Sequence, residues 1–161
     1  MLNLAIFESG QYFAEGSYGF SETTLRLPIE SNFSVEIYPA YVVVEGKAQQ
    51  HSGRPVYPFR VLLSRDLNSQ SQADVNVTIA GVPELIGRMS LIGPTCELLA
   101  NDPPNQNQLS ARVVPLEKPR MYEISGLLAL DGKKWLPFNF RVVPTEAELA
   151  LENVVAMPKR A

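Results

Sequence analysis

The chain has 161 residues, of which 45% are hydrophobic and 19% charged, a composition that excludes wholesale disorder and suits one domain with its own core. One cysteine and one histidine exclude an internal disulfide and a zinc finger within a single chain. The formal net charge of −3 disfavours the basic surface typical of nucleic-acid-binding domains. We find no secretory signal pattern and no stretch of about 20 apolar residues, so we expect a cytoplasmic protein with no membrane partner.

The predicted elements are mostly strands. Apolar and polar residues alternate in 33–37, 73–79 and 138–141, as in strands with one buried face. Further strands are expected at 2–7, 41–45, 56–64, 88–92, 109–114 and 121–130. Prolines and glycines separate these runs, which favours a barrel or sandwich of many short strands.

Other segments do not alternate clearly. Residues 11–20 hold four aromatic side chains among glycine and serine, which we interpret as a mobile loop or a wide hairpin covering the core. The polar stretches 68–72 and 101–108 are expected to be loops. Short helical turns are allowed after Pro83 and at residues 96–100.

The strongest hairpin signal is Asp131-Gly132, between two apolar runs. A two-residue loop would place Leu128 opposite Trp135. A three-residue loop would place Leu128 opposite Leu136 and match the apolar faces better. A slip of one residue exchanges the buried and exposed faces, so the register matters.

A helix is predicted at about 145–157. Thr145 is the expected N-cap, with Glu148 three residues on, and Pro158 ends the pattern. The apolar side chains of this segment are expected to dock on the chain's own barrel. A contact with another subunit or partner is the alternative.

These patterns predict a mostly β fold, a single antiparallel barrel or sandwich spanning residues 1–161 with a C-terminal α-helix. A partly open five-stranded barrel of the oligonucleotide-binding (OB) type is one realisation, with extra hairpins using the remaining length.

Candidate catalytic residues are few. His51 lies in a polar segment without a neighbouring carboxylate, and Cys96 has no base near it in the sequence, so it is expected to be a structural thiol. The acids are scattered, and there is no phosphate-binding loop or nucleophile elbow. We therefore expect a protein that is not an enzyme and has no metal or other cofactor.

Positive charge is confined to two segments of an otherwise acidic chain. Residues 47–65 carry a net charge of +4 and residues 109–143 a net charge of +3. Both segments interleave cations with aromatic rings, which is the pattern of a platform where bases stack and phosphates are neutralised. The predicted nucleic-acid-binding residues are Arg54, Tyr57, Arg60, Lys133, Lys134, Trp135 and Arg141.

The leading hypothesis is therefore a non-catalytic protein that binds single-stranded DNA or RNA, provided that the two basic segments meet in space. A homo-oligomer or another protein partner is expected to extend the binding track. The alternative is a structural or assembly protein, such as a virion or phage component or an adaptor. A third hypothesis is an enzyme or small-ligand carrier that uses the interior of the barrel.

Overall fold

The fold is a closed antiparallel β-barrel, seen in a computed structural model that describes residues 8–19, 26–50, 56–133 and 135–150. Its strands are β1 (Gly10–Gly19), β2 (Arg26–Ile37), β3 (Tyr41–Gln50), β4 (Val56–Ser64), β5 (Gln72–Ile79), β6 (Val82–Ile92), β7 (Thr95–Asp102), β8 (Asn107–Pro115), β9 (Tyr122–Ala129) and β10 (Leu136–Pro144). A 3₁₀ turn, Pro103–Asn105, precedes β8.

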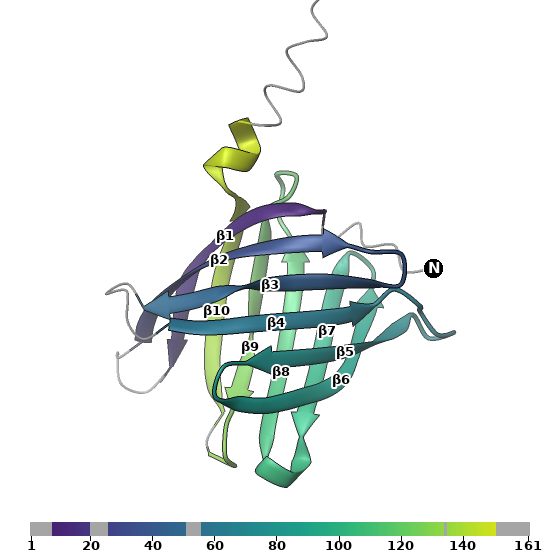
Figure 1. Cartoon of the computed structure of the whole chain (residues 1–161), viewed down its shortest axis with the longest axis vertical. Helices are drawn as coiled ribbons and strands as arrows, with labels where there is room; N and C mark the ends of the chain where they lie inside the picture. Colours follow the sequence, from purple (N-terminus) through teal and green to yellow (C-terminus); the bar gives the residue numbers. More distant parts are fainter. Residues whose placement is uncertain (1–7, 20–25, 51–55, 134, 151–161) are drawn as a thin grey trace, which may run out of the picture.

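Each strand pairs with the next along the chain, and β1 pairs with β10 to close the ladder. Strands β2 to β5 cross in front of β8 and β9 at a steep angle (Figure 1). The prediction of a mostly β barrel is confirmed. The barrel is a ten-stranded meander and not the five-stranded OB type.

The barrel has two ends, which we call the helix end and the far end. The helix end carries the connections at 38–40, 65–71, 93–94 and 116–121 and the helical residues 146–150, which stand beyond β10 (Figure 1). The far end carries the connections at 80–81, 103–106 and 131–132. No helix within the described part of the chain is long and apolar enough to cross a membrane.

Close approach between neighbouring strands depends on glycine. A Cβ on Gly126 would lie 1.9 Å from the carbonyl oxygen of Ser110, and one on Gly16 would lie 1.8 Å from that of Asn139. Glycine at such positions lets a strand bend while it stays paired, which a closed barrel requires. The ring of Phe138 lies against the space that the Gly126 side chain leaves.

The hairpin around Asp131-Gly132 has the register predicted from the apolar faces. Leu128 lies opposite Leu136 and Ile124 opposite Phe140. Asp131 and Gly132 both have positive φ, at 57° and 70°, and the backbone amide of Lys133 donates to the carbonyl of Leu130 at 3.0 Å. Of the two loop lengths considered, the register is that of the three-residue loop.

Two other sequence predictions are wrong. Residues 10–19 form strand β1 and not a loop or a separate hairpin. Their glycines do not favour a strand, but pairing with β2 on one edge and with β10 on the other stabilises it. Residues 96–100 and the residues after Pro83 are paired strand and not helical turns. The 68–72 segment is a loop up to the first residue of β5, as expected.

The C-terminal helix begins where predicted. Residues 146–150 are helical, and the backbone amide of Glu148 donates to Thr145 Oγ1 at 3.2 Å, so Thr145 is the N-cap. The predicted strand 2–7, His51 and the helix beyond residue 150 lie outside the described residues.

Candidate functional site

The described predicted binding residues do not all lie on one face of the barrel wall. Tyr57 pairs with Ala48 on the inner face of β4, whereas Arg60 pairs with Glu45 on the outer face. Tyr57 is 40% exposed. Arg54 and Lys134 lie outside the described residues. Alternation in the sequence predicts that Tyr57 and Arg60 lie on opposite faces of one strand. In the barrel the face that carries Tyr57 is the inner one.

The two basic segments lie on different sides of the barrel. Residues 47–65 belong to β3 and β4, and residues 109–143 to β8, β9 and β10. Strands β1 and β2 separate them on one side and β5, β6 and β7 on the other. The expectation that both segments line one groove is therefore wrong for this single chain.

The outward arginines of these segments lie beside acids on neighbouring strands. Arg60 Nε lies 3.8 Å from Glu45 Oε2, and Arg112 Nε lies 3.8 Å from Glu97 Oε1. Arg141 is in register with an acid on each side, Glu15 on β1 and Glu123 on β9. Exposed pairs of this kind contribute little stability, but they offset the positive charge that a phosphate would need.

Trp135 lies at the far end, immediately before β10, and is 36% exposed. The turn beside it is held by a buried polar network. The backbone amide of Asp131 donates to Asn107 Oδ1 at 2.9 Å, and Asn107 Nδ2 donates to Asp102 Oδ2 at 3.3 Å. This network fixes the 131–132 turn against the 103–106 connection. It places Lys133 and Trp135 on the rim of the far end.

A surface depression of about 180 Å³ lies on the outer face of β2, β3 and β4. Its polar groups already have partners. Tyr38 donates a hydrogen bond to Glu36 and stacks on Tyr41 with ring centroids 5.1 Å apart, and Arg60 lies beside Glu45. In the described residues no cluster of histidine, cysteine and acids could hold a metal ion.

The barrel interior differs between its two halves. Toward the helix end many inward side chains are buried, among them Tyr12, Val42, Met89, Tyr122 and Val142, although Ile37 is 40% exposed. Toward the far end Leu85, Ala100 and Asn107 are buried as well, but many inward apolar side chains are only partly buried. They are Phe59, Val61, Ile79, Leu98, Leu109, Ile124, Leu128, Leu136, Phe138 and Phe140, and we refer to them as the far-half lining.

Small residues occupy several inward positions of the far half. Gly16, Ala48, Ala111 and Gly126 all occupy inward positions in the ladder. Barrel diameter grows with strand number, and eight strands already suffice to hold one small ligand.

A few polar groups face this space. Ser31 is inward on β2, and its Oγ is closed off from solvent with no hydrogen-bond partner in the described structure. The pKa of Tyr18 is raised because the side chain is partly buried and because Tyr57 lies near it. Both tyrosines occupy inward positions toward the far end, Tyr18 on β1 and Tyr57 on β4.

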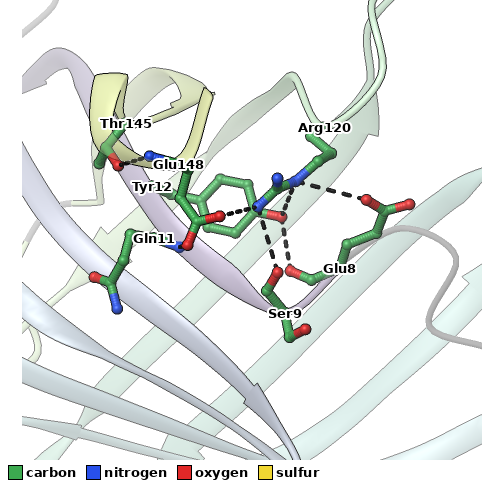
Figure 2. Close-up of polar contacts among 7 residues, drawn as sticks. All are labelled: Glu8, Ser9, Gln11, Tyr12, Arg120, Thr145 and Glu148. Atoms are coloured by element: carbon green, nitrogen blue, oxygen red, sulfur yellow. Dashed lines mark hydrogen bonds and ion pairs between the residues drawn. The ribbon is translucent and has the colours of Figure 1, made fainter. Parts of the chain in front are cut away.

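The helix end is closed by Arg120, whose side chain is 9% exposed (Figure 2). Its guanidinium contacts the hydroxyl of Tyr12 at 3.4 Å, the carbonyl of Ser9 at 3.3 Å and the carboxylates of Glu8 and Glu148 at 3.5 and 3.4 Å. The positive φ of Arg120, 64°, costs about 1–2 kcal/mol for a residue with a side chain. These contacts offset that cost.

Glu148 joins the helix to this closure. Its Oε1 accepts a hydrogen bond from the backbone amide of Gln11 at 2.9 Å while Oε2 contacts Arg120 (Figure 2). Burial raises the pKa of Tyr122, which lies inward nearby, and proximity to Tyr12 and Glu8 raises it further. The start of the helix is therefore held to the barrel through Glu148, whereas Leu149, the described member of the apolar side chains expected to dock, is 46% exposed.

Cys96 is buried on the inner face of β7, as predicted for a structural thiol. Burial, with a smaller effect of Glu97, raises its pKa to about 12. A thiol with so high a pKa is a poor nucleophile at neutral pH.

Comparisons with known proteins add little. No protein family model matches the chain, and no curated protein does. Among solved structures, the ywiB protein from Bacillus subtilis is similar with 9% sequence identity and a TM-score of 0.37, over 84% of this chain and 90% of that one.

Proposed function

We propose that this protein is a non-catalytic binding protein that holds one small, neutral and largely apolar molecule in the far half of the barrel. The proposal depends on one observation, the partial burial of the apolar side chains of the far-half lining. Apolar walls with a few polar groups are typical of small-molecule sites. Each methylene moved from water onto such walls contributes about 0.8 kcal/mol to binding.

The charge inside the barrel supports a neutral ligand. Among the described inward residues of the far half, the one charged side chain is Asp102, which already accepts hydrogen bonds from Asn105 and Asn107. A carboxylate or phosphate would lose its hydration there without gaining a cation. An uncharged ligand avoids that cost.

Binding of the neutral dye Nile red tests the proposal, because its fluorescence rises in apolar surroundings. We expect saturable binding by the full chain. The variant Ala111→Trp, which fills an inward position, should abolish it. The matched variant Ser110→Trp, one residue along on the outer face, should bind as the wild type does. Absence of binding, or equal binding by both folded variants, would refute the proposal.

Single-stranded nucleic acid is the competing ligand. A labelled oligothymidylate at about 50 mM salt should not bind if the proposal is right. Binding that weakens steeply with salt, and is lost in Trp135→Ala but kept in Tyr38→Ala, would favour the nucleic-acid hypothesis instead. Light scattering addresses the assembly role, because a large closed particle that binds neither probe would support it.

A further inference from the structure

We infer that Ser31 is the polar anchor of this site, and that its ligand is an apolar molecule carrying one hydrogen-bonding oxygen, a hydroxyl or a carbonyl. The inference rests on the proposed function and adds the chemistry of the ligand. It starts from the unpartnered hydroxyl of Ser31, whose residue is 7% exposed.

Ser31 has an orphaned polar atom where a core would ordinarily hold an apolar residue. Leaving a buried hydroxyl without a partner costs about 1–3 kcal/mol. Because its Oγ is closed off from solvent, water does not recover that cost. Such a group is rare in folded proteins and calls for a physical reason, which a ligand would supply.

The neighbours of Ser31 on the inner wall are small. Ala14 and Ala48 are its direct partners on β1 and β3, and both side chains point inward. Gly16 and Gly46 lie in the adjoining inward positions of the same two strands. Glycine and alanine therefore lie on both sides of Ser31, where they add little side-chain bulk of their own to the inner wall. A change between staggered χ1 wells turns the hydroxyl by about 120°, so it can meet a group that enters from the far end.

The aromatic residues define how such a ligand would lie. Tyr57 continues the lateral row that starts at Ala14 and passes through Ser31 and Ala48. Phe59 and Phe33 lie toward the helix end of this row, with ring centroids 6.4 Å apart. The apolar body of the ligand would contact these rings while its oxygen meets Ser31.

The test uses two neutral probes that differ by one hydroxyl, 2-naphthol and naphthalene, each displacing Nile red from the full chain. The hydroxyl of 2-naphthol should improve binding to the wild type more than it improves binding to Ser31→Ala. The dissociation constant of naphthalene divided by that of 2-naphthol should therefore be roughly three- to tenfold lower in Ser31→Ala, the range for one neutral hydrogen bond. Ser34→Ala, on the same strand but facing outward, should leave the ratio unchanged.

A thermal unfolding scan separates anchoring from packing. Ser31→Ala removes an unpaired buried hydroxyl, so its melting temperature should equal or exceed that of the wild type. If Nile red binds but the ratio is the same in the wild type and Ser31→Ala, the anchor is refuted and the proposed function stands. If Nile red does not bind the wild type, the proposed function itself is refuted.

Discussion

The guanidinium of Arg120 lies over the ring of Tyr12, with Cζ 5.3 Å from the ring centroid. Tyr12 in turn stacks on Phe33, with ring centroids 5.5 Å apart and planes inclined by 15°. The connection between β8 and β9 is thus joined to β1 and β2 through one cation and two rings. This stack closes one end of the barrel.

Replacing Arg120 by alanine should destabilise the fold by about 2–4 kcal/mol, because it removes a cation–π contact and leaves the partly buried Glu148 carboxylate without its cation. Urea unfolding followed by circular dichroism measures this change. Arg112→Ala is the control, since Arg112 forms one exposed pair and should cost less than about 1 kcal/mol. Equal losses in the two variants would contradict the role given to Arg120.

Stability should fall at alkaline pH through Cys96. Its pKa in the folded protein is about 12, above the ordinary thiol value of 9.0, so the folded state binds the proton more tightly than the unfolded state. The contribution is complete below pH 9.0 and is lost as the pH rises toward 12. Unfolding free energies of wild type and Cys96→Ala, measured by urea titration across this range, should show a steeper decline in the wild type.

The same burial predicts slow labelling of Cys96. A thiol reagent at pH 8 should modify the unfolded chain in urea quickly and the folded chain only as fast as it opens. Rapid labelling of the folded protein would contradict an inward position for this side chain.

Replacing Gly126 by alanine should destabilise the barrel by about 1–3 kcal/mol, because the added Cβ meets backbone rather than a flexible side chain. Gly81→Asn is the control. Gly81 has φ of 81° with nothing within 4 Å of its missing Cβ, and asparagine tolerates that conformation. Thermal unfolding should therefore show a clearly lower melting temperature for Gly126→Ala, and a similar change in both variants would contradict this account.

Local patterns predicted most of the strands correctly. Residues 56–64 and 73–79 alternate, and both are paired strands in the barrel. The register at Leu128 followed from matching apolar faces. Strand β1 was missed because two of its inward positions are Ala14 and Gly16, which leave no clear apolar period between the aromatic residues. Strand β7 was missed because Leu98 and Leu99 are both apolar, although only Leu98 faces inward.

The candidate site could not be predicted in the same way. Alternation placed Tyr57 and Arg60 on opposite faces, but nothing local says which face a closed barrel turns inward. Whether two distant basic segments meet depends on the order of all ten strands, which is a non-local property. Ser31 carries no signal in the sequence. Ser31 lies between Glu30 and Asn32, and three polar residues in a row predict an exposed segment. Only the pairing of Ser31 with Ala14 and Ala48 shows that it faces the barrel interior.

The bond ladder between β1 and β10 has a consequence for biosynthesis. Strand β1 takes as a neighbour β10, which is made after all the other strands of the barrel, so residues 10–19 must wait for residues 136–144 before the ring can close. Until then the nascent barrel carries unpaired strand edges, which are prone to aggregate. Closure of the ring is therefore the last pairing event that synthesis of the barrel permits.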